Sequence, residues 1–138
     1  MPLRPGDEVR SGRVFRRIQP LRSRFGRGRP KLGAFKADPA DGGKLSTTLE
    51  ALAAEERVLE VALAIVDPKG TFGLCSISID SVLAATGNSV CFIYDPDPKD
   101  SALGDAHVVV PNCDDPAIQE ILLRHAKVVR APEGPEIH

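Results

Sequence analysis

The pattern of hydrophobic and polar positions predicts strands mainly in the second half of the chain. In FGLCSISI, residues 72–79, apolar side chains alternate with serines, as expected for a strand with one face in solvent. SVCFIY (89–94) and AHVVV (106–110) are apolar on both faces, so we expect the first to be a central strand and the second another buried strand. RVFRRI (13–18) and KVVR (127–130) are expected to be the first and last strands.

A first helix is predicted in KLSTTLEALAAEERVLE, residues 44–60. Thr47 is followed three residues later by Glu50, which fits a capping box in which each side chain bonds an exposed backbone N–H. The VALAIVD stretch that follows either continues this helix or forms a strand, so residues 57–66 are left open between the two. Near-helical spacing places five apolar residues on one stripe: Leu49, Leu52, Ala53, Leu59 and Leu63.

Two shorter helices are predicted by their end signals. Asp80 is expected to cap a helix over SVLAAT, residues 81–86, which Gly87 ends. Asp115 as the cap and Pro116 at the first helical position begin the last helix. The buried stripe of this helix is expected to contain Ile118, Ile121, Leu122 and His125.

These elements predict a single α+β domain with a small mixed or antiparallel sheet, about three helices and a long basic N-terminal loop. The domain is expected to span residues 13–131, between flexible tails at 1–12 and 132–138. Within it, residues 20–43 are rich in Gly, Pro and Arg and are expected to cross the surface as a loop, with Phe35 as the apolar anchor. A chain of 138 residues with 42% hydrophobic content supplies one core.

Charge is unevenly distributed along the chain. Residues 10–31 contain eight arginines and one lysine but no carboxylate. The first 36 residues carry a formal charge of +9 and the rest −10, so the total is only −1. This division allows a segment that binds a polyanion, but it equally allows one that lies across its own or a partner's acidic surface. Arginine outnumbers lysine nine to two in the first 36 residues, and its planar guanidinium suits phosphate and carboxylate alike.

Several classes of protein and site are not expected. No apolar run approaches the roughly 20 residues that span a bilayer, and the N-terminus lacks an apolar secretory signal, so we expect a cytoplasmic protein without a membrane partner. Three widely spaced cysteines predict reduced, mostly buried thiols and no zinc site. The aspartates at 95–97 and 114–115 are explained by a turn and a helix cap, so no metal or other cofactor is expected.

Polar residues beside short apolar anchors are candidates for a functional site. Arg16, Arg17 and Lys36 are suited to binding phosphates. Beside them, Ser46 is a candidate hydrogen-bond donor and His107 a candidate acid or base. In the structural alternative, Ser46 helps to cap the first helix, His107 is a buried, hydrogen-bonded histidine, and the two arginines flank an edge strand and pair with surface acids. The wider anion-binding surface adds the other cations of the segment, which are Arg22, Arg24, Arg27, Arg29 and Lys31.

A series of short motifs is spread over most of the chain. The pieces are Arg16–Ile18 with Pro20, Ala34–Lys36, Leu45–Ser46, Gly73–Leu74, Asp95–Pro96 and Ala106–His107. In this order the chain resembles a loosely defined group of small uncharacterised bacterial proteins with the succession R-R-I-x-P, A-F-K, L-S, G-L, D-P, A-H. The resemblance implies a bacterial origin and a conflict or defence setting, but no particular reaction. This chain has Gly104-Asp105 where the group often shows Asn-Pro before Ala-His.

Three classes of function fit these observations. The first is a binding or regulatory module that recognises nucleic acid, a nucleotide or an acidic protein through its arginine-rich segment. The second is a small enzyme acting on a nucleotide-like substrate, of the ADP-ribosyl or NAD-cleaving type, with Ser46 and His107 as candidate catalytic residues. The third is an interaction protein whose basic segment packs on its own acidic domain or on a second copy, as a homo-oligomer. The binding module is favoured, since guanidiniums are concentrated in one segment.

Overall fold

The computed structural model describes residues 2–137 and contains two β-sheets. The strands of the larger sheet are β1 (Arg13–Ile18), β4 (Leu45–Leu49), β5 (Gly73–Ser78), β6 (Ile93–Tyr94), β7 (His107–Val110) and β8 (Ala126–Arg130). The smaller sheet is a hairpin of β2 (Phe25–Gly26) and β3 (Arg29–Pro30). The α-helices are α1 (Glu55–Leu63), α2 (Ile79–Thr86) and α3 (Pro116–His125). The 3-10 helices are η1 (Leu32–Phe35), η2 (Pro39–Asp41) and η3 (Gly104–Ala106).

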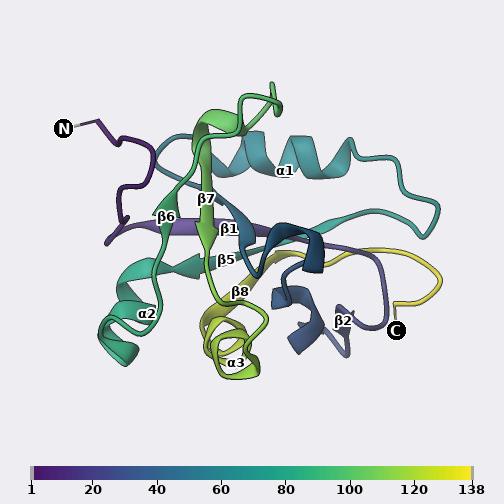
Figure 1. The fold of residues 1–138 in the computed structure, drawn as a ribbon. Coiled ribbons are helices and arrows are strands. Elements are labelled where there is room, and N and C mark those ends of the chain that lie inside the picture. The colour runs from purple at the N-terminus through teal and green to yellow at the C-terminus, as the bar shows by residue number, and fades with distance from the viewer. Residues whose placement is uncertain (1, 138) are drawn as a thin grey trace.

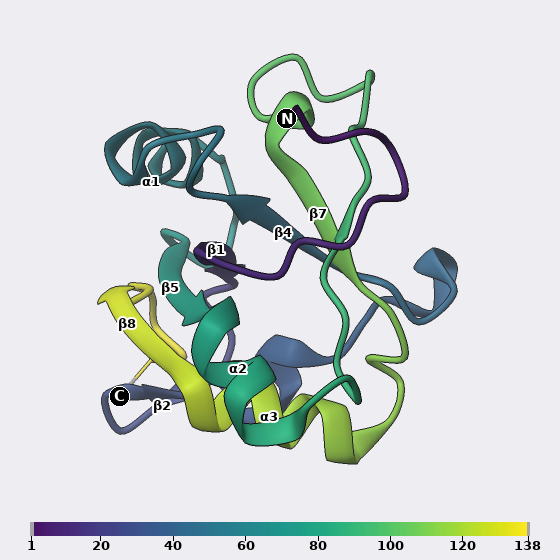
Figure 2. The same ribbon diagram turned by 90° about the vertical axis from the view of Figure 1, so that its left-hand side faces the viewer.

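The larger sheet has the strand order β6-β7-β4-β1-β5-β8, and all of its neighbouring strands are antiparallel. The sheet is strongly twisted, because β7 runs across the direction of β1 and β5 in Figure 1. In that view α1 lies above the sheet, and α2 and α3 lie below it. Figure 2 shows the same layers after a quarter turn, with α1 well separated from α2 and α3. The chain is therefore one α+β fold with helices on both faces of an antiparallel sheet.

The alternation of side chains along β1 divides the buried residues between two apolar clusters. Val14 and Ile18 belong to the larger cluster, which also holds residues of η1, α2 and α3. Phe15 belongs to a second cluster, in which it packs with Val58 of α1 and Leu74 of β5. β1 lies between β4 and β5 in the sheet and is buried on both faces.

The strands expected at residues 13–18, 72–79, 106–110 and 127–130 are present as β1, β5, β7 and β8. The expectation that the second of these has one face in solvent is wrong, because β5 is buried on both faces and Ser76 is only 3% exposed. The expectation of a central strand at 89–94 is wrong. Only its last two residues form a strand, and this strand is at the edge of the sheet. The apolar residues before it are buried without strand pairing, since they pack directly into the larger cluster. Hydrophobicity on both faces therefore indicated burial here but not strand position.

The expected capping box at Thr47 and Glu50 is also wrong, because this stretch is strand β4 and the helix begins only at Glu55. Thr47 Oγ1 donates to the carbonyl oxygen of Val108 in β7 (2.8 Å) instead of accepting from a helix N–H. Alternate residues of β4 are buried, and β4 pairs with strands on both sides, so tertiary pairing outweighs the local helix signal. As a result, Leu52 of the expected stripe lies outside the helix and is 50% exposed.

The other helix signals have mixed outcomes. The open stretch 57–66 is helical as far as Leu63. Asp115 caps α3 as expected, accepting from Ala117 N at 2.9 Å. The cap of α2 is Ser78 and not Asp80, whose carboxylate instead accepts from the backbone of the N-terminal segment. Within residues 2–137, no helix is long and apolar enough to cross a membrane.

Both expected tails make contacts with the domain. Residues 6–9 lie along the edge strand β6 on the left of Figure 1, where Val9 N donates to Phe92 O (2.7 Å) and Tyr94 N donates to Asp7 O (2.8 Å). Near the other end, Glu133 and Thr71 exchange two backbone hydrogen bonds of 3.0 and 2.7 Å. The described parts of both terminal segments are therefore hydrogen-bonded to the rest of the fold.

The segment 20–43 is less of a loop than expected, because it contains β2, β3, η1 and η2. Phe35 is completely buried, as expected for an anchor, but Phe25 is buried as well. Gly33 allows η1 to approach the hairpin closely, since a Cβ atom there would lie 2.4 Å from the carbonyl oxygen of Ser23. This segment is thus part of the core, and its cations are carried on an ordered frame.

A matched pair of substitutions tests the assignment of residues 44–60. Leu74→Ala removes a fully buried side chain from the cluster under α1, and we expect it to lower the free energy of unfolding by about 2–5 kcal/mol. Leu52→Ala makes the same chemical change at an exposed position, so its effect should stay within about 0.5 kcal/mol. Urea unfolding followed by circular dichroism measures both. A large loss of unfolding free energy for Leu52→Ala would contradict the strand and favour the helix that the sequence predicts in residues 44–60.

Candidate anion-binding site

The larger sheet opens at one point between β1 and β4. β1 pairs with β5 over its full length, from Arg13 to Ile18, but with β4 only at Val14 and Phe15. β4 itself continues to pair with β7 as far as Leu45. The two strands therefore separate after Phe15. We call this opening, between residues 16–18 of β1 and 45–47 of β4, the sheet fork.

The side chain of Arg16 bridges the sheet fork. Its Nη1 donates to the backbone carbonyl of Ser46 in β4, and its Nε donates to that of Ala34 in η1, both at 3.1 Å. These bonds replace strand pairing with contacts from a side chain, so β1, β4 and η1 are joined by one guanidinium. β1 is a central strand, so the alternative that Arg16 flanks an edge strand is wrong.

The Arg16 guanidinium is a charged group in a mostly buried place. Its pKa is lowered to about 10, mainly by burial and to a smaller degree by the neighbouring cations Arg24 and Arg17, while Cys75 acts in the opposite direction. Its charge is nevertheless retained at neutral pH. Among residues 2–137, no carboxylate lies within ion-pair distance of it. A buried cation without a counter-ion is unfavourable, so an anion at this place would be stabilising.

A cavity of about 440 Å³, which we call the outer hollow, lies beside the sheet fork. Its cations are Arg16, Arg17, Arg24 and Lys36. Its carboxylate is that of Asp38, and Oδ1 of this group accepts from Ala40 N at 2.9 Å as the cap of η2. The apolar part of the lining includes Phe72 and Pro39. The outer hollow thus combines a positive lining with an aromatic wall.

Arg24 in the outer hollow has an unused hydrogen-bond donor. Its Nη1 donates to the carbonyl oxygen of Gly33. Its Nε is buried and has no hydrogen-bond partner within residues 2–137. An unpaired buried donor costs about 1–3 kcal/mol.

A second and smaller cavity of about 130 Å³, the inner hollow, shares Arg16 and Arg17 with the outer one. Ser46 and His107 line it. His107 Nδ1 lies 2.6 Å from the carbonyl oxygen of Asp95. Because a carbonyl only accepts, Nδ1 carries the hydrogen, and Nε2 of the neutral ring is left as an acceptor. Ser46 caps no helix, since it lies in β4.

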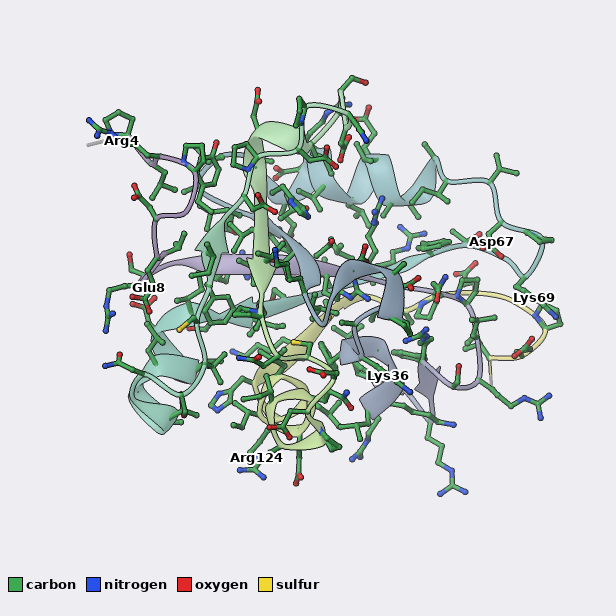
Figure 3. The ribbon with its side chains drawn as sticks, viewed as in Figure 1. Arg4, Glu8, Lys36, Asp67, Lys69 and Arg124 are labelled. Atoms are coloured by element: carbon green, nitrogen blue, oxygen red, sulfur yellow. The ribbon has the colours of Figure 1, made fainter. Side chains whose placement is uncertain are left out.

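A third cavity of about 660 Å³, the hairpin hollow, is formed around β2 and β3. Its cations are Arg22, Arg27, Arg29 and Lys31. The carboxylate in its lining is that of Glu136, which accepts from Arg22 N (3.1 Å) and pairs with Lys69 Nζ (3.2 Å). These contacts lower the pKa of Glu136. Figure 3 shows Lys69 at the loop beside the C-terminal segment, and Lys36 at the end of η1.

Most cations of the basic segment have no acidic partner in the chain. Among residues 2–137, Arg22 is the only one of the eight cations at 16–36 within ion-pair distance of a carboxylate, at 3.9 Å from Glu136. Earlier in the chain, Arg13 pairs with Glu50 and Glu55. The acidic remainder of the chain therefore neutralises little of this segment directly. The unpaired cations are Arg16, Arg17, Arg24, Arg27, Arg29, Lys31 and Lys36.

The structure brings together the five residues singled out in the sequence, which are Arg16, Arg17, Lys36, Ser46 and His107. All five line the inner or outer hollow, and the two hollows share Arg16 and Arg17. The remaining cations divide, with Arg24 in the outer hollow and the others in the hairpin hollow. Sequence reasoning missed Thr48, Asp97 and Asp100 in the inner hollow and Phe72 in the outer one. The strand alternation that placed Phe72 near a sheet was the one available signal.

Several of the short motifs in the sequence are joined by hydrogen bonds. Arg16 connects the R-R-I piece to Ala34 of the A-F-K piece and to Ser46 of the L-S piece. His107 of the A-H piece is bonded to Asp95 of the D-P piece. Pieces that are far apart in the chain thus meet around the two hollows.

Comparison of the chain with protein-family models, with curated proteins and with solved structures finds no match. The function is therefore argued from the residues of this chain.

The role of Arg16 at the sheet fork predicts a loss of stability when it is removed. Arg16→Ala leaves two backbone carbonyls without donors, and we expect the free energy of unfolding to fall by about 1–3 kcal/mol. Arg17→Ala, at the neighbouring exposed position, should change it by less than about 0.5 kcal/mol. Urea unfolding measures both. Equal effects of the two substitutions would contradict the bridging role.

Proposed function

We propose that this protein is a binding module that recognises nucleic acid through the cations of residues 16–36. The observation that supports this best is that seven of these eight cations lack a carboxylate at ion-pair distance within residues 2–137. A segment serving only to neutralise its own domain would be paired with that domain's acids. Positive potential left uncompensated attracts external anions. The resemblance to small bacterial proteins adds a bacterial conflict or defence setting to this proposal.

Phosphate is favoured over the carboxylates of an acidic protein. Specific protein interfaces usually have an apolar core, whereas interfaces with nucleic acid are more polar and strongly positive. Around the hairpin hollow the apolar side chain of Phe25 is only 2% exposed, while Arg27 and Arg29 are exposed. The exposed side chains of the hairpin itself are therefore those of Arg27 and Arg29. Guanidiniums also bind phosphate oxygens through two parallel hydrogen bonds.

Charge reversal on the hairpin tests the proposal. The double variant Arg27→Glu/Arg29→Glu alters two exposed side chains without ion-pair partners in the described chain, so we expect it to fold normally. Its affinity for a short fluorescent DNA duplex should fall by about tenfold or more, because phosphate contacts are lost. Each lost contact should also reduce the slope of log affinity against log salt concentration by about 0.9. Fluorescence anisotropy at a series of salt concentrations measures affinity and slope together.

A matched control carries the same change of charge elsewhere. Arg57→Glu/Arg124→Glu acts on exposed residues of α1 and α3, which pair only with near neighbours on their own helices. It should retain nearly normal binding apart from a weak general effect of net charge. Binding that is independent of salt, or that both double variants weaken equally, would contradict the proposal. Displacement of the DNA by polyglutamate at equal charge concentration would favour an acidic protein as the partner instead.

A second candidate function is a small enzyme acting on a nucleotide-like substrate, of the ADP-ribosyl or NAD-cleaving type. It is favoured by the inner hollow, where Ser46 and His107 line the same cavity as Arg16 and Arg17. The bond from His107 Nδ1 to Asp95 orients the ring and leaves Nε2 as a proton acceptor. Two arginines beside such a histidine would hold a diphosphate near it.

Release of nicotinamide from NAD tests this candidate. If the inner hollow is catalytic, His107→Ala should lower the rate by about 10²–10⁴-fold, the range typical of general acid–base catalysis, while His125→Ala should leave it unchanged. His125 is a matched control because it lies on α3, away from the lining of the inner hollow. A protein without any release of nicotinamide, or a rate that His107→Ala leaves intact, would remove the candidate.

A further inference from the structure

We infer that the outer hollow binds the phosphate monoester of a single nucleoside, with the phosphate at the sheet fork and the base against Phe72. This inference rests on the proposed function and names a distinct recognition site within it. The hairpin would follow the backbone of a strand, whereas the outer hollow would hold one nucleotide unit.

The lining of the outer hollow carries positive charge that no carboxylate of the described chain pairs with, and this places the phosphate there. Arg16, Arg17, Arg24 and Lys36 line the same cavity, and within the described residues none of them is paired with a carboxylate. Arg24 Nε is a buried donor without a partner. A phosphate monoester carries close to two negative charges at neutral pH and three acceptor oxygens, so it matches this set in charge and in hydrogen bonding.

The volume and the lining of the outer hollow favour a whole nucleotide over a bare phosphate ion. Its volume of about 440 Å³ lies in the range of small-molecule sites, of about 300–1,000 Å³, and is far larger than a phosphate needs. Phe72 and Pro39 supply an apolar side to the cavity. An aromatic ring stacks on any nucleobase without regard to its identity. The site is therefore expected to select the phosphate and a ring, but not a particular base.

Asp38 sets the orientation of the nucleotide in the outer hollow. Its Oδ1 is occupied by Ala40 N at 2.9 Å, which fixes the carboxylate at the start of η2. A phosphate next to this carboxylate would be repelled, so the phosphate lies toward Arg16 and Arg24. A sugar hydroxyl is instead a suitable donor to the free oxygen of Asp38.

Two sources supply this chemistry, which are a free mononucleotide and the terminal phosphate of a strand. Titration calorimetry with AMP, adenosine and inorganic phosphate tests the shared chemistry. We expect AMP to bind about tenfold or more tightly than either part alone, because the phosphate and the ring are held at the same time. AMP that binds no better than adenosine, or no detectable binding of AMP at low salt, would overturn the inference.

Two variants and a control test the placement. Lys36→Glu reverses the charge of an exposed residue of the hollow, and we expect it to weaken AMP binding by about tenfold or more. Phe72→Ala should weaken AMP but leave inorganic phosphate unchanged. Lys99→Glu makes the same charge change at an exposed position outside the lining, so AMP should bind normally. Equal effects of Lys36→Glu and Lys99→Glu would overturn the placement. Thermal melts confirm that each variant is folded.

Competition identifies the source and separates this inference from the proposed function. An oligonucleotide with a 5′-phosphate that displaces AMP better than its 5′-hydroxyl form identifies a strand end, and displacement by neither form identifies a free nucleotide. Equal displacement by both forms would overturn the selection of a phosphate monoester. Duplex binding that depends on Arg27 and Arg29 without any AMP binding would overturn the inference and leave the proposed function standing. AMP binding without any duplex binding would support the hollow and contradict the proposed function.

Discussion

The structure depends on one partly buried guanidinium that takes the place of strand pairing. Where β1 and β4 separate, Arg16 donates to Ser46 O and to Ala34 O, each at 3.1 Å. The sheet can open there without leaving these carbonyls unpaired, and the opening is bordered by the inner and outer hollows. The same residue carries a charge that the described chain does not pair with a carboxylate. The structural support and the proposed affinity for anions therefore involve the same side chain.

The folded backbone of the basic segment holds its cations at defined positions. Phe25 and Phe35 are buried in the core, so the hairpin and η1 are fixed against the sheet. Cations on a backbone fixed in this way lose less backbone freedom on binding than cations on a disordered arm. The segment thus packs on the rest of the fold. It does so through apolar residues and backbone carbonyls more than through acids, which leaves the charge available.

Sequence patterns predicted the elements whose signals are local. The strand expected at residues 13–18 and the Asp115-Pro116 start of α3 both correspond to the structure. The helix start predicted at Thr47 and Glu50 was wrong, because the same residue types also fit a strand that pairs on both sides. The hydrogen bond that fixes Thr47 in this strand goes to Val108, which lies far along the chain. The candidate site was predictable only as a set of residue types. The partners of Arg16 are backbone carbonyls, which no sequence motif specifies, and the unpaired Nε of Arg24 follows from its packing.

The central claim is that an anion binds at the sheet fork, and NMR titration of the isotope-labelled protein with AMP tests it most directly. The account predicts that the largest changes occur at the Nε–Hε signals of Arg16 and Arg24 and at the backbone amides of Arg17 and Lys36. The chemical shifts of α2, which contributes no residue to the outer hollow, should not change. Changes confined to the exposed hairpin arginines, or spread evenly over all surface cations, would contradict it.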